Sequence, residues 1–343
     1  MDRQINAALF GVGNMGKLTA AYMLEKGVNI VSAFNRTSHV GEDLGIASGL
    51  GHLNVTIESI DGATLDQDLD VAVITAVSDM KALFPLAERC LLKGINVITI
   101  SEEAFFPAPS EPELTDRLDC AAKANNATLV STGVQDIFWL SIPANLTGAC
   151  HVANSIVGTS KVNLDVYGPA VVSQFPIGLT PDQFNSAARN DDAPQPLPIF
   201  GIALEALVAK LGFTVIKRTL RYEPLFDSVA IRSDSLDRLI DPGLTTGLSE
   251  ISEITTKEGI DCRVEFIQKI FGAGESEEIS WRVGGIPDLQ VKFDNFMGAE
   301  ITCATLVNRI PDVINAEPGF STVSDLPIAV YRSSPLHKYI NRP

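Results

Sequence analysis

The chain has 343 residues, enough for two domains with separate cores. Hydrophobic residues make up 45% and charged residues 20% of it, a balance typical of globular proteins and not of disordered chains. The formal net charge of −16 disfavours binding to nucleic acid, and no apolar run approaches the roughly 20 residues that a membrane helix needs. Five scattered cysteines without a C-x-x-C pair, and no signal peptide, predict a reduced, cytoplasmic protein.

The first part of the chain alternates strand-type and helix-type segments. Apolar or β-branched runs that predict strands lie at residues 5–13, 29–35, 70–76, 95–101 and 127–132. Segments with helical spacing lie at residues 16–27, 80–94 and 114–126. This alternation predicts right-handed βαβ units, and therefore an N-terminal Rossmann domain with a doubly wound parallel sheet over residues 1–150.

After residue 150 the pattern changes to strands separated by polar turns. Strands are predicted at residues 155–168, 213–224, 228–232, 262–272, 278–285 and 289–293, with a helix at 201–212. We therefore expect residues 151–343 to form an α+β substrate and dimerisation domain with a mainly antiparallel sheet. The helix near 301–316 is expected to pack back towards the nucleotide domain.

A glycine-rich loop directly follows the first strand and opens the first helix. Its sequence is Gly11-Val12-Gly13-Asn14-Met15-Gly16, the G-x-G-x-x-G pattern of dinucleotide-binding sites. The first glycine permits the tight turn, the second lets the pyrophosphate approach the backbone, and the third allows close helix–strand packing. The alternative is a merely structural turn, but the strand–loop–helix context favours NAD(P) binding.

The end of the second predicted strand indicates which cofactor is bound. Strict NAD sites place a carboxylate there for the ribose 2′-hydroxyl, whereas this chain has Asn35, Arg36 and Thr37. Arg36 can pair with a 2′-phosphate, so NADP(H) is favoured and NAD(H) remains possible; the alternative is a solvated turn arginine. Thr75 and Ser78, at the end of the strand at 70–76, are expected to contact the nicotinamide ribose.

Two adjacent carboxylates, Glu102 and Glu103, follow the strand at 95–101 and precede Phe105 and Phe106. One of the pair can enter the cleft at this edge of the sheet while the other faces elsewhere. An apolar setting raises the pKa of a carboxyl group towards neutrality, which suits proton transfer. The alternative is an acidic pair favoured by a helix N-terminus.

Several motifs together resemble a known family. They are GVGNMG, VGEDLG, the glutamate pair followed by Pro107, PIGLTPDQF at 176–184, GIALEALVAKLG at 201–212, DPGLTTGL at 241–248 and ATLVNRIPDVINAEPG at 304–319. The chain resembles the 2,4-diaminopentanoate dehydrogenases and related NAD(P)-dependent amine dehydrogenases, whose nucleotide domain is similar to that of dihydrodipicolinate reductase. The resemblance implies reductive amination of a ketone or aldehyde with ammonia and the reverse oxidative deamination. It also implies a homodimer, and an acid–base role that maps to Glu102, with Glu103 as the alternative.

The chain departs from the diaminopentanoate pattern at residues 165–172, which contain no Arg or Lys. A substrate carboxylate therefore lacks its obvious partner, and we expect Phe138, Trp139 and Tyr167 to line an apolar pocket. Ordinary core packing is the alternative for these aromatic residues. Asn308 is expected to reach the nicotinamide carboxamide or the substrate, unless it is a structural amide.

Two competing functions stay open. A dihydrodipicolinate-reductase-like or sugar dehydrogenase places a Lys at this strand end, where the chain has Glu103. A non-catalytic nucleotide sensor on the same fold is the other alternative. No His or Cys spacing suggests a metal site, and none is expected.

Overall fold

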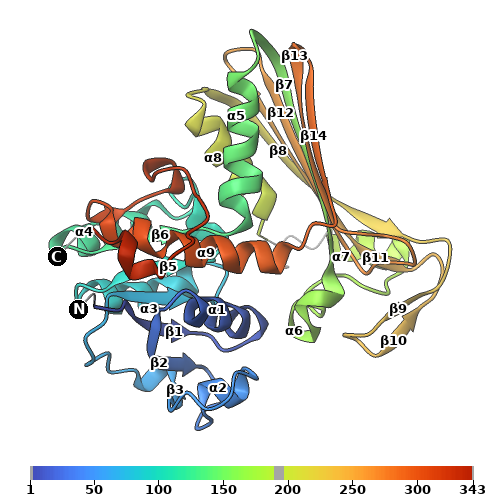
Figure 1. The fold of residues 1–343 in the computed structure, drawn as a ribbon. Helices are drawn as coiled ribbons and strands as arrows, with labels where there is room; N and C mark the ends of the chain where they lie inside the picture. Colours follow the sequence, from blue (N-terminus) through green and yellow to red (C-terminus); the bar gives the residue numbers. More distant parts are fainter. Residues whose placement is uncertain (1–2, 189–196, 342–343) are drawn as a thin grey trace. The chain divides into compact units, whose positions relative to one another are not determined.

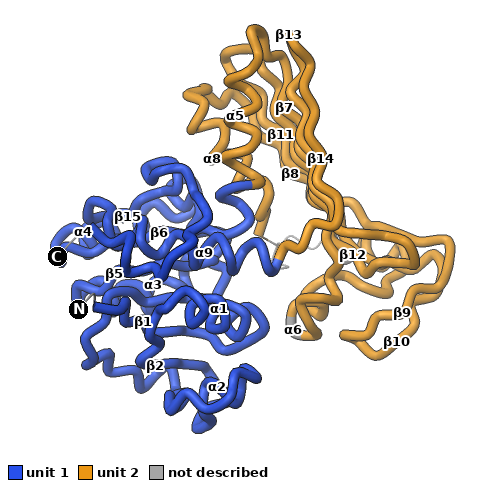
Figure 2. The backbone as a smooth tube through the Cα atoms, viewed as in Figure 1, with its two compact units in different colours: residues 1–137, 299–343 blue, residues 138–298 orange. Residues whose placement is uncertain are grey.

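The computed structural model describes residues 3–188 and 197–341. Its backbone divides into two compact units, one of residues 1–137 and 299–343 and the other of residues 138–298 (Figure 2). The first unit is discontinuous, because the chain leaves it after residue 137 and returns at residue 299. The boundary was expected at residue 150, and the compact units divide at 137/138. Residues 299–343 belong with the N-terminal unit.

The first unit is built on a seven-stranded parallel sheet in the order β15-β6-β5-β4-β1-β2-β3. Figure 1 labels β6, β5, β1, β2 and β3 of this sheet. Its strands are β1 (Asn6–Phe10), β2 (Asn29–Asn35), β3 (Ile57–Ser59), β4 (Val71–Ile74), β5 (Asn96–Thr99), β6 (Thr128–Ser131) and β15 (Gly319–Phe320). Strands β4, β5 and β6 are buried along their whole length, which explains their uninterrupted apolar sequences. The strand order reverses between β1 and β4, where doubly wound sheets bind their ligands.

Helices follow the strands of this sheet. They are α1 (Asn14–Glu25), α2 (Leu44–Ala47), α3 (Met80–Leu91), α4 (Pro112–Ala124) and α9 (Gly298–Asn315), with short 3-10 helices η1 (Ile60–Gly62), η2 (Glu103–Phe105), η5 (Val323–Asp325) and η6 (Leu336–Tyr339). Helix α3 shows the local logic: the Asp79 carboxylate accepts a hydrogen bond from Ala82 N at 2.8 Å and begins the helix. Met80, Leu83 and Ala87 then recur at helical spacing and are fully buried.

The second unit contains a six-stranded sheet in the order β14-β13-β7-β12-β11-β8. Its strands are β7 (Val152–Asn163), β8 (Val215–Phe226), β11 (Thr245–Thr256), β12 (Asp261–Lys269), β13 (Glu278–Ile286) and β14 (Leu289–Asp294), and β9 (Ile231–Ser233) pairs separately with β10 (Arg238–Ile240). The unit also holds α5 (Ile142–Gly148), η4 (Leu164–Tyr167), α6 (Pro169–Val172), α7 (Pro181–Ala188) and α8 (Ile199–Lys210). A π-helix, η3 (Gln135–Ser141), spans the junction of the two units.

The predicted fold class is confirmed, with one refinement. All neighbouring strands of the six-stranded sheet are antiparallel except β7 and β12, which pair in parallel. No strand was predicted at residues 245–256, yet β11 lies there, between β12 and β8. The polar residues of β11 obscure the apolar pattern by which a strand is predicted, because Ser249 and Glu250 are buried within the sheet.

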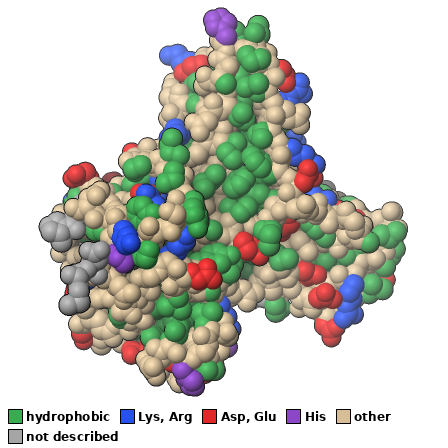
Figure 3. Space-filling model, viewed as in Figure 1, with side chains coloured by type: hydrophobic (Ala, Val, Ile, Leu, Met, Phe, Trp, Pro, Cys, Tyr) green, Lys and Arg blue, Asp and Glu red, His purple; other side chains and the backbone are tan. Residues whose placement is uncertain are grey.

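An aromatic core holds the second unit together. Phe200 on α8 stacks on Trp139 with 4.5 Å between ring centroids and meets Trp281 edge-on at 5.5 Å. Phe266 on β12 closes the cluster against Trp139 at 5.3 Å. On the face drawn in Figure 3, hydrophobic side chains also gather at the surface of the part of this unit that carries α5, while acidic and basic groups lie scattered in small patches.

Candidate active site

The carboxyl ends of β1, β4, β5 and β6 meet at one edge of the parallel sheet. The Thr75 hydroxyl, just after β4, donates to the carbonyl oxygens of Phe10 and Gly11 at 3.2 and 3.1 Å. Thr75 therefore ties the end of β4 to the start of the glycine loop. The side chain predicted to contact the cofactor ribose also supports the loop itself.

The glycine loop has the geometry of a pyrophosphate cradle. Gly11 has a φ of +99°, which favours glycine, and a Cβ on Gly16 would lie 1.9 Å from the Gly11 carbonyl oxygen. A Cβ on Gly13, by contrast, would meet nothing within 4 Å. Helix α1 begins after Gly13 with no side-chain cap and no acidic residue in its first turn. Its first N–H groups, together with the exposed Asn14 and half-buried Met15, are open to an anionic ligand.

The loop after β2 is closed by Asn35. Its Nδ2 donates to the Ser38 carbonyl oxygen and to Ser38 Oγ, both at 2.8 Å. Arg36 and Thr37 are exposed, and among the described residues Arg36 makes no hydrogen bond or ion pair. Residue 35 at the strand end is an asparagine and not a carboxylate, so it does not repel a phosphorylated ribose.

Glu102 and Glu103 have different surroundings although they are adjacent. Glu103 is buried, and its Oε2 accepts a hydrogen bond at 2.8 Å from Met80 N, the first residue of α3. Its carboxylate thus serves the N-terminus of that helix. Glu102 keeps partial exposure, and its carboxyl accepts a hydrogen bond from the Ser78 side chain.

The Glu102 carboxyl is suited to proton transfer. Desolvation raises its pKa to about 7, and the hydrogen bonds from Ser78 and from its own backbone N–H oppose the rise. Ser101, the preceding residue, is held at both ends: its Oγ donates to the Ser78 carbonyl oxygen at 2.7 Å and its carbonyl accepts from Ser131 Oγ at 2.6 Å. The edge of three neighbouring strands therefore fixes the backbone beside Glu102.

The predicted substrate-binding aromatics separate into two groups. Trp139 is 2% exposed and packs in the aromatic core of the second unit, the alternative reading of that residue. Phe138 is half-buried and meets Phe296 edge-on at 4.9 Å. Tyr167 lies at the same segment, because a Cβ on Gly298 would be 3.0 Å from its hydroxyl and 3.7 Å from the Phe296 ring. The structure thus brings Phe138 and Tyr167 to one cluster and leaves Trp139 outside it.

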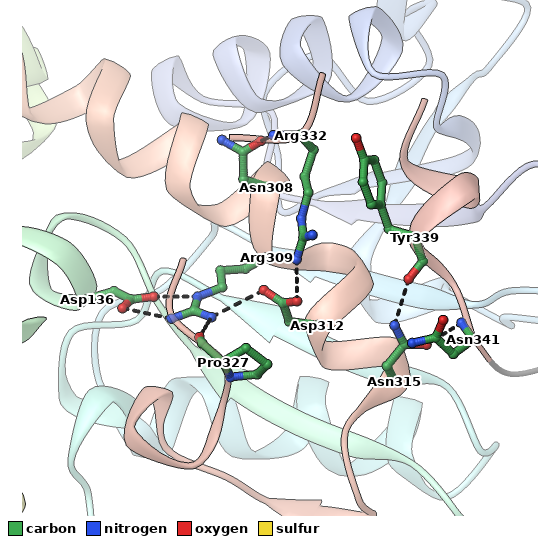
Figure 4. A network of polar contacts seen from close by, with 9 residues as sticks. All are labelled: Asp136, Asn308, Arg309, Asp312, Asn315, Pro327, Arg332, Tyr339 and Asn341. Carbon is green, nitrogen blue, oxygen red and sulfur yellow. Dashed lines mark hydrogen bonds and ion pairs between the residues drawn. The ribbon is translucent and has the colours of Figure 1, made fainter. Parts of the chain in front are cut away.

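Asn308 lies on α9 and supports the C-terminal segment. Its Oδ1 accepts a hydrogen bond from Arg332 N at 3.2 Å (Figure 4). This contact gives Asn308 a structural role in the first unit, and its contact with the nicotinamide or the substrate stays a prediction.

The next residue, Arg309, is the centre of a buried ion network that was not predicted from the sequence (Figure 4). Its guanidinium donates to both carboxylate oxygens of Asp136, at 2.7 and 3.0 Å, and contacts Asp312 at 3.2 Å and the Pro327 carbonyl. Arg332 closes the network on Asp312 at 2.6 Å. Arg309 and Asp312, two charged residues inside an otherwise apolar helical segment, could have indicated a buried ion pair from the sequence.

Within residues 3–188 and 197–341, no group of three His, Cys, Asp or Glu side chains could hold a metal ion. None of the helices in the described part of the chain is long and apolar enough to cross a membrane.

Known proteins are similar to this chain in sequence and in fold. Residues 140–341 match the family model of the 2,4-diaminopentanoate dehydrogenase C-terminal domain. A 2,4-diaminopentanoate dehydrogenase from Acetoanaerobium sticklandii is 26% identical over 340 residues, covering 95% of this chain and 94% of that protein. The structure of an amine dehydrogenase from Mycobacterium smegmatis is 36% identical with a TM-score of 0.90, covering 97% of this chain and 98% of that one.

A more distant structure shares the fold alone. Myo-inositol 2-dehydrogenase from Lactobacillus plantarum is 12% identical with a TM-score of 0.61, covering 94% of this chain and 93% of its own. The family model covers more than half of the chain, and the M. smegmatis enzyme exceeds 30% identity over nearly all of it. The chain therefore belongs to the 2,4-diaminopentanoate dehydrogenase and amine dehydrogenase family of NAD(P)-dependent oxidoreductases.

Proposed function

We propose that this protein catalyses the reductive amination of an uncharged ketone or aldehyde with ammonia, and the reverse oxidative deamination, with Glu102 as the acid–base residue. The observation that carries the proposal is a carboxyl group with a pKa near 7 at the same sheet edge as the glycine loop. Family membership supports an amine as the reduced substrate.

The cofactor site belongs to the first unit. Gly11, Gly13 and Gly16, with the uncapped N-terminus of α1, hold the pyrophosphate, and Arg36 and Thr37 face the adenosine ribose. When bound, the nicotinamide supplies or accepts the hydride. The absence of a carboxylate at Asn35 supports NADP(H) over NAD(H).

Glu102 handles the protons of ammonia addition and water loss. Ammonia adds to the carbonyl carbon and gives a carbinolamine, and protonated Glu102 then gives its proton to the departing hydroxyl, which leaves as water. The resulting carboxylate faces the iminium cation and stabilises it until the carbon accepts hydride. In the reverse direction the carboxylate removes the proton from the attacking water. A group with a pKa near 7 can serve both directions at neutral pH.

An uncharged substrate is favoured by the groups at the aromatic cluster. Residues 165–172 contain no cation, and the Glu277 carboxylate lies against the same Gly298 that Tyr167 approaches, with its Oε2 accepting from Gly298 N at 3.2 Å. Its negative charge disfavours a substrate carboxylate nearby. We therefore expect higher kcat/KM for short-chain or cyclic ketones than for 2-oxo acids in aminations followed by NADPH absorbance. A preference for 2-oxo acids would contradict this substrate class.

The decisive experiment is Glu102→Gln compared with Glu103→Gln. Loss of the proton-transferring group at 102 is expected to lower kcat by roughly 10²–10⁴, with NADPH affinity unchanged in a fluorescence titration. Glu103→Gln weakens only the contact with Met80 N at the start of α3, so it should lower the melting temperature and leave kcat close to that of the parent. An unchanged kcat in Glu102→Gln would overturn this mechanism and assign the proton transfer to another group.

A further inference from the structure

We propose that Lys17 and His39, together with Arg36, form the binding site for the 2′-phosphate of NADP(H), and that His39 takes up a proton when this phosphate binds. The proposal rests on the proposed function only in that the chain binds a nicotinamide dinucleotide. It requires nothing of the amine chemistry.

A chain of three charged or polar side chains connects α1 to the loop after β2. Lys17 follows Gly16 directly, and its Nζ lies 3.2 Å from His39 Nε2. The other ring nitrogen, Nδ1, lies 3.0 Å from Glu42 Oε2. A lysine ammonium can only donate, so His39 Nε2 accepts from it and the Nδ1 hydrogen is donated to Glu42. This pairing assigns the lone pair to Nε2 and the ring hydrogen to Nδ1.

The Lys17–His39–Glu42 hydrogen-bond chain lies where Rossmann domains distinguish the 2′-hydroxyl of NAD from the 2′-phosphate of NADP. Asn35 ends β2, the position at which Rossmann domains contact the 2′-oxygen. Its hydrogen bonds to Ser38 close the loop, and His39 then adopts the left-handed φ of +61°. Arg36, on the same loop, is exposed and makes no ion pair among the described residues. Two cations and one histidine thus gather around the strand end.

Binding of the 2′-phosphate would change the hydrogen-bond partner of His39 Nε2 and thereby favour its protonation. A 2′-phosphate carries two negative charges and only acceptor oxygens, so it draws the Lys17 ammonium into a charge-assisted hydrogen bond. His39 Nε2 then loses its donor and faces an acceptor, which a protonated nitrogen satisfies and a lone pair does not. Histidine can make this change within the physiological pH range, and the proton comes from solvent.

Charges around His39 support the protonated state once the phosphate is present. The groups that contact its ring are Lys17 from α1 and Glu42 from its own loop, and Glu42 stabilises an imidazolium. Asp43 is turned elsewhere, with its Oδ1 accepting from Gly45 N at 2.9 Å and Leu53 N at 3.1 Å. NADH lacks the phosphate, so it leaves the Lys17–His39–Glu42 chain as it is.

Isothermal titration calorimetry of the whole protein tests the proton directly. NADPH and NADH are each titrated near neutral pH in two buffers that differ in ionisation enthalpy. The expected result is net proton uptake of up to about one per site with NADPH and close to none with NADH. Equal proton exchange with the two cofactors would overturn the proposal. This comparison uses the unmodified protein and is independent of any variant's folding.

Two variants assign the effect to its residues. Lys17→Gln and His39→Asn should weaken NADPH about 10- to 100-fold, the loss of one charge-assisted hydrogen bond, and leave NADH affinity within about threefold. Asn is chosen at position 39 because it tolerates the left-handed backbone. His39→Asn should also abolish the NADPH-linked proton uptake. Lys123→Gln on α4 and His151→Asn, both outside this cluster, are the matched controls and should change neither affinity.

Equal loss of NADH and NADPH in Lys17→Gln would show that Lys17 serves the pyrophosphate, and would overturn the assignment. Unchanged NADPH affinity in both variants would do the same. A failure to aminate ketones would count against the proposed function and leave these binding measurements unaffected. The two hypotheses can therefore fail separately.

Discussion

At the scale of single residues, the two adjacent glutamates show what sequence position cannot distinguish. Both follow β5, and either could enter the cleft. The difference arises from α3, whose first N–H group donates a hydrogen bond to the Glu103 carboxylate, whereas the Glu102 carboxyl accepts one from the Ser78 side chain. That contact joins residues 80 and 103, so no local pattern reveals it. The sequence predicts a carboxylate pair at the sheet edge, and the three-dimensional contact separates the roles.

The pKa of Glu102 predicts opposite pH profiles for the two directions of the reaction. Amine oxidation needs the carboxylate as base, so kcat/KM should rise as pH increases towards about 7 and then level off. Reductive amination needs the acid form, so the enzyme-dependent part of kcat should fall as pH rises through about 7. Initial rates in both directions, in buffers of constant ionic strength, measure these inflections. An inflection near 7 that persisted in Glu102→Gln would belong to another group.

At the scale of elements, β11 explains why part of the second unit escaped prediction. Glu250 lies on this strand and is fully buried, with its Oε1 accepting from Gly201 N of α8 at 2.8 Å. Among the described residues, its Oε2 has no hydrogen-bond partner. Burial raises the pKa of this carboxyl to about 7, and the N–H groups of α8 oppose the rise. Strand alternation is unrecognisable where a charged residue takes an interior position, whereas the apolar runs of β4, β5 and β6 were predicted readily.

Glu250 should make the stability of the protein depend on pH. Its folded pKa, near 7, lies above its ordinary value of 4.5, so the folded state holds the proton more tightly than the unfolded chain. The stabilising free energy from this proton is therefore fully present below about pH 4.5, decreases as the pH rises to about 7, and does not change further above that pH. The free energy of unfolding of Glu250→Gln, compared with that of the parent, should therefore increase by up to about 3 kcal/mol when the pH is raised from 5 to 8. Urea denaturation at both pH values measures the difference; a gap of similar size at both would refute the assignment.

Helix α9 is held by the buried network rather than by apolar packing alone. Arg309 is 1% exposed and pairs with both oxygens of Asp136. Breaking one partner of a buried pair strands the other charge, so Asp136→Ala should cost roughly 3–5 kcal/mol in the free energy of unfolding. Glu88→Ala, which removes the exposed pair with Arg117, is the control and should cost far less. Equal losses in chemical denaturation would mean that the network carries no special stability.

At the scale of the whole molecule, the chain crosses between its units twice, at 137/138 and at 298/299. A change of pattern near residue 150 was visible in the sequence, but the return of residues 299–343 to the first unit depends on contacts far apart in the chain. These include the parallel pairing of β15 with β6 and the bonds from Arg309 to Asp136. The discontinuous unit is therefore a property of tertiary packing, although the helix near 301–316 was expected to pack back towards the nucleotide domain.

The two units should respond differently to truncation. Removal of residues 299–343 deletes α9 apart from Gly298, including the buried Leu306, Val307 and Ile310. Asp136 then loses its Arg309 partner and keeps the hydrogen bond from Thr132. Residues 1–137 alone should then fail to give a cooperative thermal transition or to bind NADPH, because the glycine loop loses its support at the Met15 carbonyl, which Cys303 contacts at 3.5 Å. Residues 138–298 are continuous and contain their own aromatic core, so this fragment should give a sheet-rich circular dichroism spectrum and a cooperative melt. Supplying residues 299–343 as a separate peptide is the control, since it should restore NADPH binding to the N-terminal fragment. Tight nucleotide binding by residues 1–137 without the peptide would show that α9 is dispensable for the fold of the nucleotide-binding unit.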